Sequence, residues 1–337
     1  MSPRGDSRNI SVSILQKFAG SSLSPSTTSS SCSIDESYKY IFLPICYSFT
    51  FIFSIFLNSV ILYRSFRQSR RWNASLIYMV NLASTDFMYG LSLPFLVASY
   101  IMRDRWVFGD FMCRLVRFLF YFNLYCSIFF LTCISVHRYL GICHPMKVIT
   151  LETKKAVKCT CVLVWIVVFA LTCPIFRFAQ TGHVKRLNCW DDAIDKEFPD
   201  YIPYGIILHL LGFFIPFSII AWCYSHVVLT IFRTLHSQIS ISLGTIITIT
   251  LLFALCFFPF HVTRTIFLLL KVAKGVPCHT ITMVSMCYKI TRPLASFNAW
   301  LNALLYFLTK DKVHTTHSFA DFQIFPPGTQ LSSPLWG

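Results

Sequence analysis

Charged residues are scarce in this chain. Lys, Arg, Asp and Glu make up 13% of its 337 residues, and only 14 residues are acidic. Hydrophobic residues make up 55%, and the mean hydropathy is +0.60. Because soluble domains carry about 25% charged residues, the composition excludes an ordinary soluble protein and favours one embedded in a lipid bilayer.

Motifs of enzymes and metal sites are also missing. The 14 cysteines show no paired CxxC spacing, and the chain has no HExxH, no P-loop and no arrangement of a nucleophile with a base. Cys159-Thr160-Cys161 lies in a hydrophobic run, which favours packing. We therefore expect no enzymatic activity. No internal repeat or pair of interrupted helices is visible, which argues against a transporter or channel.

Seven long hydrophobic segments are what the chain does contain. They follow a serine-rich start without a cleavable signal pattern, and they span 38–63, 74–101, 110–142, 155–176, 200–234, 239–270 and 282–309. Runs of this length and composition are typical of helices that cross a bilayer. The sequence therefore predicts an all-α membrane protein with a seven-transmembrane helix bundle.

The short loops differ in charge, and this difference predicts the orientation. Residues 64–71 contain four arginines and no acid, and residues 147–158 contain four lysines against one glutamate. Residues 191–200 instead contain five acids. Because positive loops stay in the cytoplasm, we expect an extracellular arm at 1–37, a membrane domain at 38–309 and a short cytoplasmic tail at 310–337. The net charge of +15 then reflects membrane topology, so we expect no nucleic-acid partner.

In this orientation, four cysteines lie outside the cell: Cys32, Cys113, Cys189 and Cys278. An oxidising exterior favours pairing, and four cysteines allow three connectivities, with free thiols as the alternative. Asn9 begins an Asn-Ile-Ser glycosylation sequon, which is consistent with an extracellular amino terminus.

The stretch Phe253–Arg264 contains the most informative charge in the chain. It ends a run, Ile239–Phe260, that has no Lys, Arg, Asp or Glu. Pro259 interrupts the helix, because proline removes a backbone hydrogen bond. His261 and Arg264 then lie three residues apart, on one helix face. A cation at this depth needs a partner or water, so we expect Arg264 to face a wet cavity and bind an anion.

The order of the motifs resembles that of rhodopsin-like (class A) G-protein-coupled receptors, over roughly 38–309. The residues that carry this resemblance are Asn58, Asn81–Asp86, Cys113, His137-Arg138-Tyr139, Trp165, Pro216, Tyr224, Cys256–Pro259, Asn298, Asn302 and Tyr306. Three further stretches, Ser135–Pro145, Pro259–Thr265 and Tyr288–Ser296, are similar to the purinergic branch, the metabotropic nucleotide receptors. They look most like the members that respond to uridine nucleotides.

The resemblance implies a plasma-membrane receptor for an extracellular nucleotide of the ADP, ATP, UDP or UTP type. Such a receptor would signal through a heterotrimeric G protein to phospholipase C and calcium. It also implies two disulfides, Cys113–Cys189 and Cys32–Cys278. The residues it implies for the G-protein switch are His137, Arg138, Tyr139, Tyr224, Asn302 and Tyr306. Asp86, Ser127 and Asn298, with Asn302, look like the family's buried sodium and water cluster; a protonated or water-bonded Asp86 is the alternative, and no other cofactor is expected.

A ligand pocket can be placed on the outer halves of three helices. A guanidinium offers a planar fork of donors that suits phosphate oxygens, and an aromatic floor can stack a base. The predicted ligand-binding residues are Arg117, Phe120, Tyr121, Tyr125, His261, Arg264, Tyr288, Lys289, Arg292 and Ser296.

Each of these residues also has a plainer interpretation. Arg117 could extend to the outer headgroups, and Arg264 could pair with Asp191 or Asp192. The aromatic residues could be core, and His261 could serve packing. The ligand could instead be a small carboxylate metabolite or a lipid.

A coupling-impaired decoy receptor is the remaining alternative. Ala303 follows Asn302 where the family usually has proline, so a kink there is in doubt. No Lys or Arg occurs between Arg233 and Arg264, and the loop between the fifth and sixth segments is very short.

Overall fold

The structure is a computed structural model of the whole chain. It describes residues 37, 39–67, 72–146, 153–183, 187–190, 198–233, 247–273, 275–304 and 306–307, and all of them belong to one compact unit, Asp35–Gly337. The predicted sites Asn9 and Cys32 lie outside these residues, as do Asp191 and Asp192.

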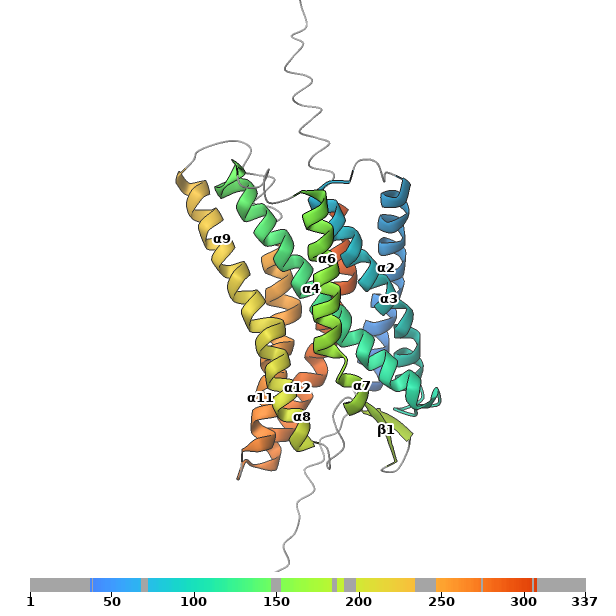
Figure 1. Cartoon of the computed structure of the whole chain (residues 1–337). Coiled ribbons are helices and arrows are strands. Elements are labelled where there is room, and N and C mark those ends of the chain that lie inside the picture. Colours follow the sequence, from blue (N-terminus) through green and yellow to red (C-terminus); the bar gives the residue numbers. More distant parts are fainter. Residues whose placement is uncertain are drawn as a thin grey trace, which may run out of the picture. The chain divides into compact units, whose positions relative to one another are not determined.

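Helices dominate the described chain and form a bundle (Figure 1). They are α2 (Lys39–Arg67), α3 (Ala74–Ile101), α4 (Gly109–Cys143), α6 (Lys154–Thr172), α7 (Ile175–Phe178), α8 (Phe198–His209), α9 (Ile215–Arg233), α11 (Phe258–Val272) and α12 (Cys278–Ser296). Residues 247–252 and 298–304 are helical as well. Where the chain is described, the seven predicted segments are helical except for turns at Cys173-Pro174 and Phe297, and the predicted fold is confirmed.

Local sequence explains where two of the helices begin. The Asn73 side chain accepts a hydrogen bond from the Leu76 backbone N–H at 2.8 Å, and the Thr153 hydroxyl accepts one from Ala156 at 3.2 Å. Both are N-caps, which satisfy backbone donors that lack a partner inside the helix. Pro174 follows the end of α6, where proline cannot continue the hydrogen-bond ladder.

Three helices depart from regular geometry. A π-helical turn, η2 (Leu210–Phe214), joins α8 to α9, and a second, η3 (Phe253–Phe257), precedes α11. The second turn ends just before Pro259, so the predicted interruption there is confirmed. The last helix breaks at Phe297, four residues after Pro293, and 298–304 are helical across Asn302 and Ala303. The sequence left open whether the helix is kinked at Ala303. The structure instead shows the break at Phe297, nearer to Pro293.

A short β-hairpin lies where the sequence predicts only an acidic loop. Strand β1 (Gln180–His183) pairs antiparallel with β2 (Leu187–Trp190). Figure 1 places β1 and α7 at one end of the bundle, which we call the hairpin end.

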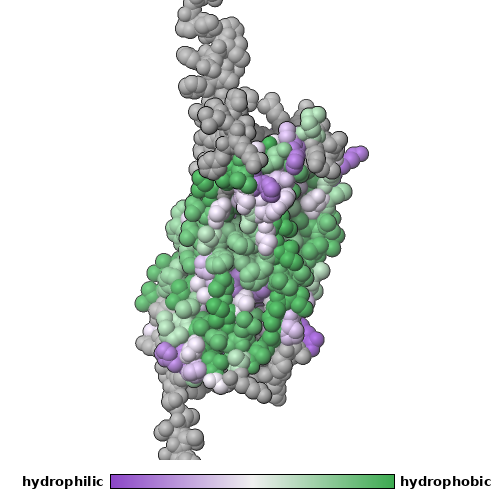
Figure 2. Space-filling model, turned by 90° about the vertical axis from the view of Figure 1, so that its left-hand side faces the viewer, coloured by the Kyte–Doolittle hydropathy of each residue, from purple (hydrophilic) through white to green (hydrophobic). Residues whose placement is uncertain are grey.

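The exterior of the bundle suits lipid. Five helical stretches are long and apolar enough to cross a membrane: Lys39–Arg67, Gly109–Cys143, Lys154–Phe178, Tyr201–Thr230 and Ile247–Val272. The face in Figure 2 is mostly hydrophobic over its middle and more hydrophilic toward its two ends. Helix α4 is the central element, because it packs against α3, α6 and α9.

Candidate functional site

The three predicted arginines are all buried inside the bundle and not directed at lipid. Arg117 on α4 is 5% exposed, Arg264 on α11 is 0% exposed and Arg292 on α12 is 7% exposed. The interpretation of Arg117 as a side chain that extends to the headgroups therefore does not fit the structure. Three buried guanidinium groups from three helices concentrate positive charge in a low-dielectric interior, where an anion is attracted strongly.

Arg264 lies among aromatic rings. Its Nη2 donates a hydrogen bond of 2.6 Å to the Tyr201 hydroxyl. Its guanidinium carbon lies 4.6 Å from the centre of the Tyr288 ring, 5.4 Å from that of Tyr201 and 5.8 Å from that of Phe267. These are cation–π distances, so three aromatic rings surround the guanidinium.

The other two arginines have different contacts. Arg117 Nη2 donates a hydrogen bond of 2.9 Å to the backbone oxygen of Cys189, so strand β2 fixes this side chain. The Arg292 guanidinium carbon lies 4.9 Å from the centre of the Phe120 ring. Each of these two contacts is made to a neutral group.

The predicted aromatic residues form one connected cluster between α4, α11 and α12. Phe120 contacts Phe260, and Phe260 contacts Tyr288, with ring centroids 5.6 Å apart in both pairs. The hydroxyls of Tyr121 and Tyr288 are 3.5 Å apart, and the Tyr121 and Tyr125 rings are stacked 6.5 Å apart. Because Arg264 and Arg292 both contact rings of this cluster, the structure brings their side chains to one region.

His261 lies deeper on α11 and is fully buried. Its ring is surrounded by those of Phe213, His209 and Tyr125, at centroid distances of 4.1, 5.2 and 5.7 Å. Neither His261 nitrogen, nor the Tyr125 hydroxyl, has a hydrogen-bond partner among the residues that the structure describes. Buried polar groups without partners are uncommon and point to a functional or hydrated position.

Two of the ten predicted ligand-binding residues lie at the margin of this cluster. The Ser296 hydroxyl lies 2.8 Å from the Tyr89 hydroxyl, and the Tyr89 ring lies 5.9 Å from that of Phe120. Ser296 is therefore tied to α3 beneath the cluster. Lys289 is only partly buried on α12.

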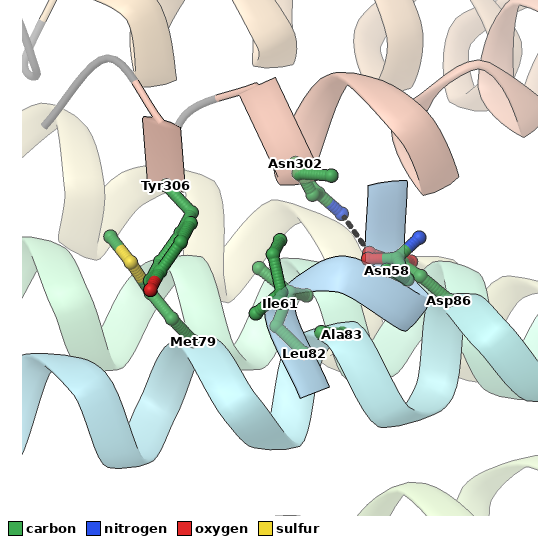
Figure 3. Close-up of a pocket in the computed structure, with 9 residues that line it drawn as sticks. Asn58, Ile61, Met79, Leu82, Ala83, Asp86, Asn302 and Tyr306 are labelled. Atoms are coloured by element: carbon green, nitrogen blue, oxygen red, sulfur yellow. Dashed lines mark hydrogen bonds between the residues drawn. The ribbon is translucent and has the colours of Figure 1, made fainter. Parts of the chain in front are cut away.

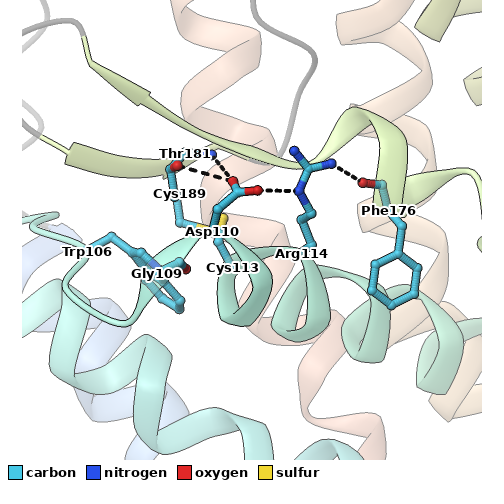
Figure 4. A network of polar contacts seen from close by, with 8 residues as sticks. All are labelled: Trp106, Gly109, Asp110, Cys113, Arg114, Phe176, Thr181 and Cys189. Carbon is cyan, nitrogen blue, oxygen red and sulfur yellow. Dashed lines mark hydrogen bonds and ion pairs between the residues drawn. A yellow bond between two sulfur atoms is a disulfide. The ribbon is translucent and has the colours of Figure 1, made fainter.

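A disulfide and a polar network attach the hairpin to α4, as Figure 4 shows. The predicted Cys113–Cys189 disulfide is confirmed, and Cys278 is also disulfide-bonded. Asp110 accepts hydrogen bonds from the Thr181 backbone N–H at 3.0 Å and the Thr181 hydroxyl at 3.1 Å. Arg114 bonds Asp110 at 2.6 Å and also donates to the backbone oxygen of Phe176. Since Arg117 bonds Cys189, this attachment also sets the position of a predicted ligand contact.

A second polar site lies around Asp86, which is fully buried on α3. Its carboxylate accepts hydrogen bonds from Asn123 at 2.6 Å and Asn302 at 3.2 Å, and Asn302 also bonds the Ser127 hydroxyl at 3.3 Å. Figure 3 shows Asn302 pointing at Asp86 in a small pocket that Asn58 also lines.

The amide of Asn298 belongs to the same predicted site. Neither of its polar atoms has a hydrogen-bond partner within the described ranges. Oxygen donors of this kind suit a small hard cation, so the residues present fit a sodium ion.

The predicted switch residues other than Asn302, which belongs to the Asp86 site, lie at the opposite end of the bundle from the hairpin. The Tyr224 hydroxyl lies 2.7 Å from that of Ser135, and the Tyr139 hydroxyl lies 3.2 Å from His144 Nε2. Tyr224 and Tyr306 are buried, whereas Arg138 is half-buried. His137 is half-buried beside it.

Sequence reasoning missed three residues that complete these sites: Tyr89, Asn123 and Tyr201. Asn123 lies four residues before Ser127, a predicted member of the Asp86 site, so helical spacing could have found it. Tyr201 begins the fifth hydrophobic segment beside Tyr204, and only this aromatic pair distinguishes it in the sequence.

Comparisons with known proteins agree with this arrangement. Residues 57–306 match the family model for the 7 transmembrane receptor (rhodopsin family). The chain is 40% identical over 295 residues to the Y-type purinoceptor 4 of Rattus norvegicus, covering 86% of this chain and 81% of the relative. It is 39% identical over 293 residues to the Y-type purinoceptor 3 of Meleagris gallopavo, covering 84% and 89%. It is 39% identical over 289 residues to the Y-type purinoceptor 2 of Rattus norvegicus, covering 84% and 77%.

Proposed function

Because this chain belongs to the rhodopsin family of seven-transmembrane receptors and, within it, to the Y-type purinoceptors, we propose that it is activated by an extracellular nucleotide. It is a multi-pass protein of the plasma membrane and belongs to a receptor family, not to an enzyme family. It signals through a heterotrimeric G protein, with phospholipase C and calcium as the downstream response. The hairpin end faces the exterior, and the end with Arg138 and Tyr224 faces the G protein.

The observation that carries this proposal is the burial of Arg264 and Arg292 against one aromatic cluster, with buried Arg117 one turn before Tyr121 of the same cluster. A nucleotide combines several phosphate charges with a planar base. Guanidinium groups bind phosphate oxygens through parallel N–H donors, and they lose little hydration in doing so. The rings of Phe120, Tyr121 and Tyr288 offer faces for the base.

The remaining predicted contacts support the same ligand. Lys289 lies one turn before Arg292 and is partly exposed, so it suits the terminal phosphate of a longer chain. His261 and Tyr125 lie deeper and can offer hydrogen bonds to polar atoms of the base.

A sodium ion at Asp86, Ser127 and Asn298 is part of the proposal. Bound there, it would supply a positive charge that balances the Asp86 carboxylate in the middle of the membrane. Asn123 and Asn302 orient that carboxylate through the hydrogen bonds described above.

A panel of adenine and uracil nucleotides, with dicarboxylates as controls, tests the ligand class in transfected cells by calcium or inositol phosphate release. We expect nucleotides to activate the receptor. Arg264→Ala and Arg292→Ala should each raise the half-maximal concentration at least tenfold at equal surface expression, since a hydrogen bond to a charged group contributes about 1.5–3 kcal/mol. Arg105→Ala is the matched control, because Arg105 is exposed.

Other results would point to the alternatives. Activation by dicarboxylates alone would replace the nucleotide with a small carboxylate metabolite. Nucleotide binding without calcium or inositol phosphate release would identify a decoy. Unchanged nucleotide potency in both arginine variants would exclude the proposed phosphate contacts.

A further inference from the structure

Tyr201 makes a close polar contact with the most deeply buried of the three arginines. Its hydroxyl accepts the 2.6 Å hydrogen bond from Arg264 Nη2, and its ring lies 5.4 Å from the guanidinium carbon. Tyr201 itself is 3% exposed. A guanidinium has five N–H donors, and this hydrogen bond from one of them restricts the direction in which the group points.

A small satellite cluster, made of Phe178, Tyr201, Tyr204 and Leu268, holds Tyr201 in place. The centroid of the Phe178 ring lies 5.3 Å from that of the Tyr201 ring and 5.5 Å from that of the Tyr204 ring. The Tyr204 hydroxyl donates a hydrogen bond of 2.8 Å to the backbone oxygen of Leu171. The cluster therefore links α6, α7, α8 and α11, and the Tyr201 ring itself contacts Phe178 on α7 and Arg264 on α11.

Close helix packing adds to this restraint. A Cβ atom at Gly205 would lie 3.0 Å from Leu268 Cδ1 and 3.6 Å from Tyr201 Cε1. The glycine thus permits α8 to approach α11 closely. Tyr201 lies one turn before Gly205, where α8 and α11 pack closely. This close packing limits the positions that the Tyr201 hydroxyl can adopt.

We propose that Tyr201 is a positioning residue for phosphate recognition: its hydroxyl orients the Arg264 guanidinium so that other N–H donors of the group are presented to the anionic part of the ligand. This inference rests on the proposed function. An arginine that is already oriented loses less conformational freedom on binding. Tyr201 therefore acts through Arg264 and contributes most for ligands that carry phosphate.

The test compares Tyr201→Phe with Tyr204→Phe, both in full-length receptor. Each substitution removes one hydroxyl from the same cluster, but only the first removes the bond to Arg264. For Tyr201→Phe we expect the half-maximal nucleotide concentration to rise about threefold to tenfold, as for one side chain that must be ordered on binding. Maximal response and surface expression should be retained. Tyr204→Phe should change the potency by less than about twofold, because it leaves the Arg264 contact in place.

A double-substitution cycle separates positioning from packing. In an Arg264→Ala background, Tyr201→Phe should cause no further loss of potency, because the group that it orients is gone. An equal loss in both backgrounds, unchanged potency or a gain in potency for Tyr201→Phe would each overturn the inference. If the unaltered receptor responds to no nucleotide, the proposed function fails, and the inference fails with it.

Discussion

Among the glycines whose surroundings the structure describes, Gly212 is the one at which an added methyl group would come closest to a neighbouring atom. It lies in the π-helical turn η2, and a Cβ atom there would lie 2.5 Å from Tyr125 Cε1 and 2.6 Å from Tyr125 Cδ1. Those atoms belong to a fully buried ring that is stacked on Tyr121. The glycine therefore allows η2 to pack directly against the ring of a predicted ligand-binding residue.

We expect Gly212→Ala to destabilise the purified receptor by about 1–3 kcal/mol, the usual result of overpacking a core. Thermal unfolding of the detergent-solubilised protein measures this. Gly141→Ala is the matched control, because Gly141 is also helical and a Cβ atom there would meet nothing within 4 Å. It should be neutral or slightly stabilising, since alanine favours helix over glycine.

A second substitution checks the cause. Combined with Tyr125→Leu, which removes the ring, Gly212→Ala should lose most of its effect on unfolding. If both glycine variants unfold at the same temperature, the steric explanation is wrong.

At the residue scale, the sequence pointed to a charged residue in an apolar helix, Arg264, but not to the aromatic residue Tyr201 that contacts it. Arg264 could be found because a cation in a long apolar helix requires a partner. The structure places it inside the bundle with Tyr201 as a polar partner, and the wet cavity and the role in ligand binding stay predictions. Tyr201 could not be found, because an aromatic residue at the start of a membrane helix fits packing equally well. Its contact with Arg264 depends on the approach of two helices distant in the sequence.

The β-hairpin is attached to α4 by a disulfide and by polar contacts, and these contribute unequally to stability. The Cys113–Cys189 disulfide closes 76 residues of chain, a length at which loop closure contributes about 4–5 kcal/mol. The Arg114–Asp110 ion pair has side chains that are 29% and 45% exposed, and such surface pairs contribute about 0–1 kcal/mol. The disulfide should therefore dominate, with the Asp110 contacts to Thr181 as a minor addition.

This difference predicts the behaviour of two variants. Cys189→Ser should strongly reduce folded receptor at the cell surface, and the receptor that remains should lose nucleotide potency because Arg117 loses its backbone contact. Asp110→Ala should retain surface expression and shift the unfolding temperature by only a few degrees. Surface labelling and thermal unfolding measure both effects. A larger loss for Asp110→Ala than for Cys189→Ser would reverse the assigned order.

The elements show how far sequence patterns reach. Hydrophobic length predicted the seven helical segments, and Pro259 predicted the interruption of the sixth, because both follow from local chemistry. The hairpin, the turn η2 and the break at Phe297 were not predicted. They depend on pairing and packing between elements, and no local residue pattern specifies such contacts.

At the scale of the whole molecule, the Asp86 site connects the two functional ends of the bundle. It joins α3 and α4 to the helical segment 298–304 through Asn123, Ser127 and Asn302. That segment continues from α12, which carries Arg292, and leads to Tyr306. We therefore expect a change in the packing of α12 at the ligand end to alter the contacts of Asn302 with Asp86 before it affects Tyr306.

A bound sodium ion at Asp86 would shift the equilibrium between two packings of these helices. An ion that binds one of two packings more tightly shifts the equilibrium toward that packing. If sodium favours the packing that does not couple to the G protein, nucleotide affinity should fall severalfold when choline chloride is replaced by sodium chloride at constant ionic strength. Asp86→Asn keeps the size of the side chain but removes its charge, so the two salts should then give the same affinity.

Ser92→Ala is the matched control for this experiment. Ser92 is also buried on α3, but its hydroxyl bonds the backbone oxygen of Tyr89 within the same helix. This variant should keep the salt difference of the unaltered receptor, and nucleotide binding to membranes from expressing cells measures all three proteins. Equal affinity of the unaltered receptor in both salts would argue against sodium at Asp86. A salt difference that persists in Asp86→Asn would place the ion elsewhere, because no other carboxylate among the described residues lies in this core.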